Sequence, residues 1–186
     1  MLSKLGKLFD TNPRLRRDVS DTVADAVCAD YASSATYQTL YEISASLTAR
    51  PSLGLLTPSA GVEFGSRPDQ LKQVLGDPEL NLYTPREHLL FYRITAGGYK
   101  MRCEFHFHKS CLFYARRTFS SVNMLEADEV FSAIRAKYLQ DGPFDPEREK
   151  IVDIQGNELF ARDGDELQIS YLRAHNASFN SIYAGV

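Results

Sequence analysis

Apolar and polar positions alternate most clearly between residues 89 and 119 of the chain. From Tyr99 to His108 every second side chain is apolar, as in a strand that buries one face. The dipeptides Gly97-Gly98 and Lys109-Ser110 separate this run from two further strand-like runs. The pattern predicts a three-stranded antiparallel meander whose middle strand turns these polar side chains towards water: Lys100, Arg102, Glu104, His106 and His108.

Apolar residues at helical spacing precede the meander. Asn12-Pro13 is typical of a helix start and predicts a helix to about Tyr31. A second helix begins at Ser33 or Ser34 and is ended by Arg50-Pro51. Outside these helices, residues 2–9 predict a short amphipathic turn. The polar tail from residue 173 predicts a short docked helix.

Two helices and a second set of strands complete the body of the chain. Capping patterns predict helices over 66–75 and 124–139, the second beginning at Asn123 with Glu126 three residues on. Three strands follow, over 151–155, 158–162 and 166–172, and the turn Asp163-Gly164-Asp165 joins the last two. The element order is therefore a helix and three strands, twice.

These elements predict an α+β fold. We expect an antiparallel sheet of five or six strands, helices packed on one of its faces, and two extra N-terminal helices. Residues 51–65 hold two prolines and three glycines, which marks a connector. The predicted organisation is a helical segment over 1–50, this connector, and an α+β body over 66–186, together forming one compact domain.

Composition and charge narrow the functional classes. With 186 residues, 44% hydrophobic and 24% charged, the chain is typical of a globular domain. Its net charge of −3 and pI of about 5.8 argue against nucleic acid as the main partner. The charge is uneven, at +4 over residues 1–17, +5 over 86–117 and −6 over 141–166. This asymmetry can serve a partner or an internal contact.

The cysteines and the N-terminus predict a soluble cytoplasmic protein. A turn at residues 108–110 would place Phe107 opposite Cys111, with Cys103 roughly 13 Å from it. That distance is too long for a disulfide, and the odd count of three cysteines favours a reducing compartment. The N-terminus shows no signal-peptide pattern, and no stretch is long and apolar enough for a membrane span.

Candidate chemistry along the sequence is sparse. His106 and His108 form a His-x-His pair that can ligate zinc, but no third ligand is predicted beside them. We find no serine elbow, no Cys–His pair on one face and no phosphate-binding loop. We therefore expect no cofactor, and an enzyme of undetected type or a metal-binding protein remains an alternative. A further alternative is weak nucleic-acid binding by a basic sheet with Tyr114 as a stacking residue.

One stretch of the sequence resembles a known family. Gly65-Ser66 enters the helix over 66–75, which carries Leu71, Val74 and Leu75 and is left through Leu75-Gly76-Asp77-Pro78. With the strands that follow, the stretch Val62–Tyr92 resembles the small outer-membrane assembly lipoproteins and β-lactamase-inhibitor proteins. The resemblance implies a binding role for the exposed sheet face and no catalysis. The element order is also similar to that of small secretion chaperones of bacterial injection systems.

We therefore expect a non-enzymatic protein-binding module. Its partner would be another protein or a second copy of the same protein in a homodimer, with no role for a membrane. The polar face of the meander is the candidate binding surface, formed by Lys100, Arg102, Glu104, His106, His108, Tyr114 and Arg116.

Overall fold

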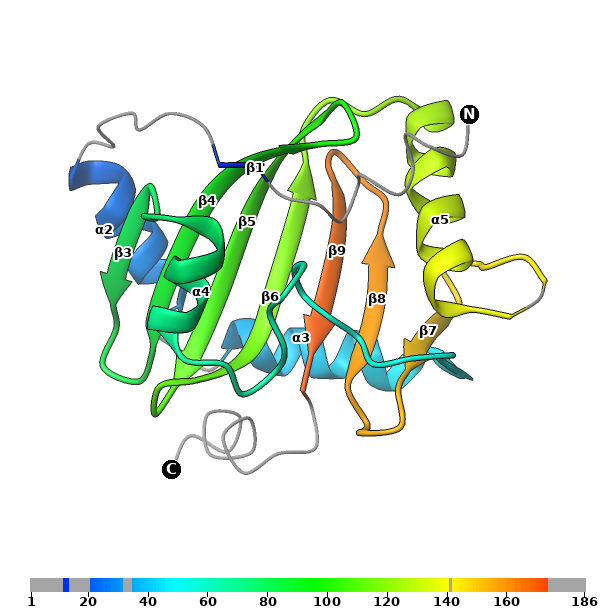
Figure 1. The fold of residues 1–186 in the computed structure, drawn as a ribbon, viewed down its shortest axis with the longest axis horizontal. Helices are drawn as coiled ribbons and strands as arrows, with labels where there is room; N and C mark the ends of the chain where they lie inside the picture. Colours follow the sequence, from blue (N-terminus) through cyan, green and yellow to red (C-terminus); the bar gives the residue numbers. More distant parts are fainter. Residues whose placement is uncertain (1–11, 14–20, 32–34, 141, 174–186) are drawn as a thin grey trace.

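A single sheet between two pairs of helices organises the protein (Figure 1). The computed structural model describes residues 12–13, 21–31, 35–140 and 142–173. Within them, the helices are α2 (Asp21–Tyr31), α3 (Ala35–Ser46), α4 (Pro68–Leu75) and α5 (Met124–Tyr138). The strands are β1 (Asn12–Pro13), β2 (Thr48–Pro51), β3 (Leu80–Tyr83), β4 (His88–Ala96), β5 (Tyr99–His108), β6 (Cys111–Phe119), β7 (Glu149–Val152), β8 (Glu158–Arg162) and β9 (Leu167–Leu172).

The α+β class is confirmed, but the sheet is larger than predicted. Within the described residues it has nine strands in the order β1-β4-β5-β6-β9-β8-β7-β2, and β3 also pairs with β4. The sheet is mixed because β2 runs parallel to β7, whereas the other pairs are antiparallel. The three additional strands have two to four residues each. Runs this short carry too little alternation to be recognised in a sequence.

Two meanders form the centre of the sheet. The first is β4-β5-β6 and the second is β7-β8-β9, and they join through the antiparallel pair β6–β9. Because the last strands of both meanders meet, the strand order of the second is the reverse of the first. Each meander follows a helix, α4 or α5, as the predicted element order requires, with β3 added to the first unit.

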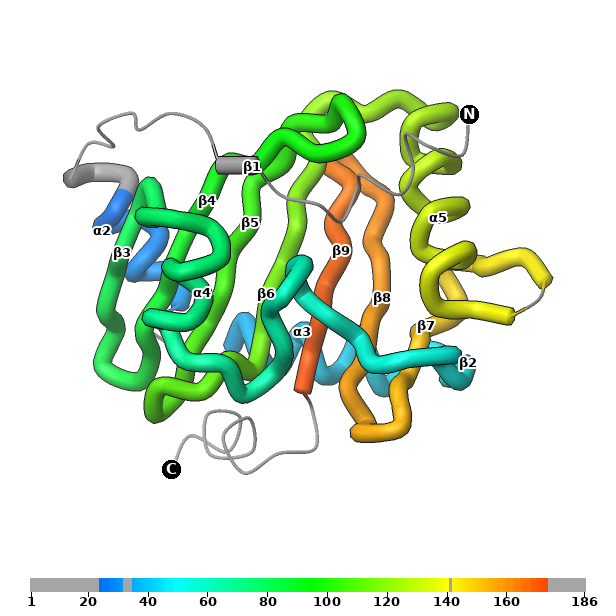
Figure 2. The backbone as a smooth tube through the Cα atoms, in the orientation of Figure 1, coloured from blue at the N-terminus to red at the C-terminus, as the bar shows by residue number. Residues whose placement is uncertain are grey.

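The first face of the sheet carries the main core. Met101, Cys103, Phe105 and Phe107 of β5 are buried on it, as their alternation predicts. Helices α4 and α5 cover this face with apolar stripes that include Leu71, Leu75, Val130 and Ile134. The connector after β2 then returns across the same face to α4 (Figure 2).

Local signals at helix ends and turns are confirmed in two places. Asn123 Oδ1 accepts from Glu126 N at 3.1 Å while Glu126 Oε2 accepts from Asn123 N at 2.8 Å, closing the predicted capping box. The loop 163–165 joins β8 and β9 as expected.

The β5–β6 turn differs from the prediction. It has two residues, Lys109 and Ser110, with φ of 48° and 62°. It therefore pairs Cys111 with His108 rather than with Phe107. The three cysteines are free, as expected.

The predicted N-terminal helices begin and end elsewhere. Asn12-Pro13 does not start a helix but forms β1 against Thr95 and Ile94. The described part of the first helix begins at Asp21, and α3 ends at Ser46, since the backbone then extends into β2. The boundary drawn at residue 50 falls inside β2. The predictions for residues 2–9 and for the tail after residue 173 lie outside the described residues.

The second face of the sheet is not open to water as predicted. Helices α2 and α3 pack on it, and Figure 1 shows α3 behind the sheet, whereas α4 lies in front of it. Their buried side chains Tyr31, Tyr37 and Leu40 meet Phe113 and Phe160 of the sheet. In the described part of the protein, no helix has the length and apolar character that crossing a membrane requires.

Asp153 ties the connector to the turn between β7 and β8. Its buried carboxylate accepts hydrogen bonds at 2.9 Å from Leu56 N, Gln155 N, Asn157 N and Asn157 Nδ2. Four donors from two segments thus depend on one side chain.

We expect Asp153→Ala to lower the free energy of unfolding by about 3 kcal/mol, because it leaves buried donors without an acceptor. Urea denaturation measures this change. The matched control is Asp163→Ala in the exposed turn after β8, which should change it by less than about 0.5 kcal/mol. Equal effects of the two substitutions would contradict the assigned role.

Candidate functional site

A buried polar network lies between the second face of the sheet and helices α2 and α3. We use this term for Tyr31, Tyr37, Glu87, Glu104, His106 and Arg116. Glu104 and His106 occupy alternate positions of β5, so both point to the second face. On β6, Arg116 lies directly opposite Glu104 and Tyr114 opposite His106.

The helices supply the tyrosines. Tyr31 is the last residue of α2, and Tyr37, Leu40 and Ser44 form one buried stripe on α3. Their spacing of three and four residues keeps them on the side that faces the sheet. The stripe therefore directs the hydroxyl groups of Tyr37 and Ser44 towards a charged face of the sheet.

Glu104 is held by Arg116 and Tyr31. Arg116 Nε donates to Glu104 Oε1, and Tyr31 OH donates to Glu104 Oε2 at 3.0 Å. Arg116 Nη2 in turn donates to the Tyr31 oxygen at 2.8 Å. The three side chains form a closed ring of charge-assisted hydrogen bonds, which are stronger than neutral ones.

His106 is held by Tyr37 and lies between two carboxylates. Tyr37 OH donates to Glu87 Oε2 and lies 2.6 Å from His106 Nδ1. Because the hydroxyl has one hydrogen, we assign the proton between them to Nδ1, which donates to the Tyr37 oxygen. The other nitrogen, Nε2, faces Glu104 Oε2 at 3.7 Å. With one proton on Nδ1, a neutral ring would direct the lone pair of Nε2 at the Glu104 carboxylate. This arrangement favours a second proton on Nε2, which makes His106 an imidazolium.

The pKa shifts agree with this assignment. Burial alone would lower the pKa of His106, but its contacts with Glu104 and Glu87 outweigh burial and raise the pKa above the usual 6.5. Burial alone would raise the pKa of Glu104, but its contacts with His106 and Arg116 lower it to about 2. Burial and the charge of Glu104 raise the pKa of Tyr31 well above its ordinary range. With His106 charged, two cations balance two carboxylates.

A second polar contact fixes the far end of α3. Ser44 Oγ donates to Glu158 Oε2 and accepts from Lys150 Nζ at 2.9 Å, and Lys150 Nζ also contacts Glu158 Oε1 at 2.8 Å. Ser44 and Glu158 are buried. Polar contacts therefore set the position of α3 at both ends.

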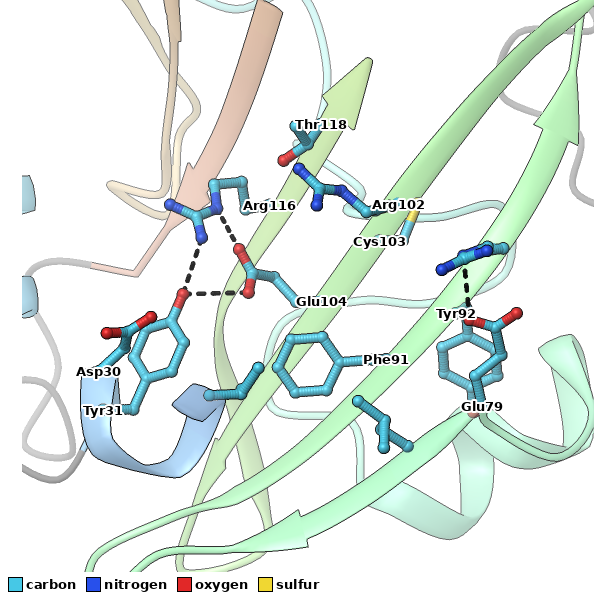
Figure 3. A pocket seen from close by; sticks show the side chains of 13 residues that line it. Asp30, Tyr31, Glu79, Phe91, Tyr92, Arg102, Cys103, Glu104, Arg116 and Thr118 are labelled. Atoms are coloured by element: carbon cyan, nitrogen blue, oxygen red, sulfur yellow. Dashed lines mark hydrogen bonds and ion pairs between the residues drawn. The ribbon is translucent and has the colours of Figure 1, made fainter. Parts of the chain in front are cut away.

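Next to the network, the helices leave part of the second face uncovered. This second-face pocket has a volume of about 290 Å³ and lies between α2, β3 and strands β4 to β6 (Figure 3). Glu104, Arg116 and Tyr31 form its wall on the network side. Arg102 and Thr118 line it further along β5 and β6, and its lining also includes the apolar side chains Val27, Leu80 and Phe91.

The structure separates the predicted site residues into three groups. Arg102, Glu104 and Arg116 line the second-face pocket. His106 and Tyr114 are fully buried, and Glu104 is only 7% exposed, so the prediction that the strand's polar side chains face water is wrong for Glu104 and His106. The physical reason is that α2 and α3 cover this part of the strand and bring the hydroxyl groups of Tyr31 and Tyr37 into hydrogen-bonding distance of Glu104 and His106.

The remaining predicted residues lie at the ends of β5. Lys100 is exposed near its start, and His108 at its end makes a hydrogen bond between Nδ1 and Arg86 O at 3.0 Å. His106 and His108 thus have different surroundings, and in the described residues no group of three or more His, Cys, Asp or Glu side chains could hold a metal ion. Tyr114 lies beneath the helices, so the stacking surface of the nucleic-acid alternative is not exposed.

Sequence reasoning missed several residues of the network and the pocket. Tyr31 and Tyr37 belonged to predicted helices, and Glu87 preceded the meander without a recognisable pattern. Arg93 and Thr118 lie on β4 and β6 at positions that share the second face with Arg102. The register of the two hairpins could have identified both, because cross-strand neighbours follow from the turn positions.

Comparison with known proteins gives no relative from which a function could be transferred. No protein-family model matches the sequence, and neither a curated protein nor a solved structure is significantly similar to it.

We expect His106→Ala to lower the free energy of unfolding by about 3 to 5 kcal/mol, because it leaves two buried carboxylates without the cation between them. Chemical denaturation measures the change. His108→Ala is the matched control on the same strand and should cost less than about 1 kcal/mol. A loss for His106→Ala no greater than that of the control would show that His106 is not charged in the folded protein.

Stability should also depend on pH through His106. Because the pKa of His106 is raised in the folded protein, the contribution of its charge to the free energy of unfolding is fully present below pH 6.5. That contribution is lost as the pH rises through the folded-state pKa. In an NMR titration, His106 should deprotonate above pH 6.5 and His88 below it, because burial and Lys72 lower the pKa of His88. His106→Gln should remove the decline of stability with pH. Deprotonation of His106 below pH 6.5 would contradict the proton assignment.

Proposed function

We propose that the protein is a non-enzymatic binding module and that the second-face pocket receives a side chain or terminus of a partner protein. The observation that carries this proposal is the lining of the pocket, which combines apolar side chains with arginines of three adjacent strands. Val27, Leu80 and Phe91 supply the apolar part, and Arg93, Arg102 and Arg116 supply the charged part. Protein interfaces combine an apolar centre with a polar rim in this way and are enriched in arginine.

The ionisable groups of the pocket support binding rather than catalysis. A general base needs a pKa near the working pH. The pKa of Glu104 is about 2, and that of Tyr31 lies far above neutrality. Both side chains also direct their hydrogen bonds to each other and to Arg116. Glu104 and Tyr31 therefore form a fixed wall of the pocket, which is suited to recognising a ligand.

Rigidity of the pocket supports the proposal further. Strands β3 to β6, which are hydrogen-bonded to one another, line it together with α2, whose end is fixed by Tyr31. A preformed site loses little conformational entropy on binding. The partner is another protein or a second copy of the same protein, and the cytoplasm is the compartment that we propose for it.

Charge reversal at the pocket tests this function. We expect Arg102→Glu to reduce capture of partner proteins from an extract of the producing cells at least about tenfold, by quantitative mass spectrometry, because Arg102 is more than half exposed at the pocket. Arg148→Glu is the matched control and should capture as the unchanged protein does. Arg148 is 85% exposed and precedes β7, three strands beyond β6.

Equal capture by both variants and the unchanged protein would reject the pocket as the binding site. Sedimentation of the purified protein covers the homodimer. If the partner is a second copy, Arg102→Glu should convert a dimer to a monomer and Arg148→Glu should not.

A further inference from the structure

Two arginines face each other at the second-face pocket. Arg93 of β4 lies directly opposite Arg102 of β5, and like charges at such positions destabilise a sheet. Each makes one described ion pair, Arg93 Nε with Glu79 at 3.3 Å and Arg102 Nη2 with Glu166 at 2.5 Å. Their side chains are 55% and 56% exposed. Because a guanidinium has five N–H donors, most donors of both groups remain for a ligand.

A hydroxyl group lies beside them. Thr118 of β6 is directly opposite Arg102 and lines the pocket, with 5% of the residue exposed. Figure 3 shows its oxygen next to the guanidinium group of Arg102, on the side of Arg116. A ligand oxygen placed here would bond with Thr118 and Arg102 together.

The surrounding charges favour a carboxylate over a phosphate. Asp30, Glu79 and Glu104 also line the pocket, so a doubly charged anion would meet three acidic groups. A carboxylate carries one charge and matches the planar fork of arginine with two parallel hydrogen bonds. The apolar side chains of the pocket favour a ligand that has an apolar group next to its carboxylate. The volume of about 290 Å³ is at the lower end of ligand pockets and suits one or two residues.

We propose that the second-face pocket binds a carboxylate with an adjacent apolar side chain, through Arg102, Arg93 and Thr118. This inference rests on the proposed function and names the chemistry that the partner presents. An acidic side group within a polypeptide and the free carboxyl terminus of a polypeptide both supply that chemistry.

Four short peptides distinguish these sources by NMR titration of the full-length protein. The first pair is acetyl-Ala-Ala-Phe with a free carboxyl terminus and its amidated form. The second is acetyl-Phe-Glu-Ala amide and its glutamine analogue. We expect one acidic peptide to bind saturably in the millimolar range and its neutral partner to bind about tenfold more weakly, since the loss of one charged hydrogen-bonded pair corresponds to such a factor. The acidic peptide that binds identifies the source of the carboxylate.

Variants connect this binding to the named residues. Arg102→Gln should weaken the acidic peptide about tenfold, and Thr118→Val, which keeps the shape, about threefold. Neither should alter the neutral peptide, and Arg148→Gln should alter neither. Thermal unfolding checks that each variant is folded.

Equal affinity of acidic and neutral peptides, an absence of saturable binding, or tighter binding of inorganic phosphate would overturn the carboxylate assignment. Measurement of capture distinguishes these outcomes from failure of the proposed binding function. Capture that depends on Arg102 without peptide binding would keep the binding module and reject the ligand class. Capture that does not depend on Arg102 would reject the binding site itself.

Discussion

Two buried carboxylates, Glu87 and Glu104, constrain the whole second side of the molecule. A buried charge is costly unless it is paired and hydrogen-bonded. The sheet provides the cations His106 and Arg116, but the remaining donors come from the tyrosines of α2 and α3. Apolar packing alone would allow the helices to slide on the sheet. The hydroxyl groups of the tyrosines accept only one placement, so the network fixes where the helices lie.

Several local signals of the sequence were informative, although Asn12-Pro13 forms a strand and does not start a helix. The meander, the capping box at Asn123 and the Asp163 hairpin depend on neighbouring residues, and the structure confirms them. Alternation along β5 also showed which side chains share a face. It could not show whether a second layer covers the polar face, because Glu104 and His106 look the same in water and in a satisfied network. Their partner Tyr31 lies 73 residues from Glu104.

The charged groups on the second face of the sheet have two kinds of surroundings. Where α2 and α3 cover it, charged groups of the sheet pair with one another and with the tyrosines of the helices. Where they do not, Arg93 and Arg102 lie opposite each other at the pocket. Arg116 and Glu104 belong to both regions, so the network that holds the helices also fixes a wall of the pocket. Site rigidity and fold specificity therefore come from the same contacts.

The long separation between α3 and its partners has a consequence for biosynthesis. Ser44 of α3 bonds to Glu158, 114 residues later, and Arg50 of the adjoining strand β2 bonds to Glu149, 99 residues later. At a synthesis rate of about 5 to 20 residues per second, Ser44 is synthesised roughly 6 to 23 s before Glu158. Helix α3 therefore completes its contacts only late in synthesis. Until then the nascent polypeptide exposes the apolar stripe of α3, which is the interval in which a chaperone would meet it.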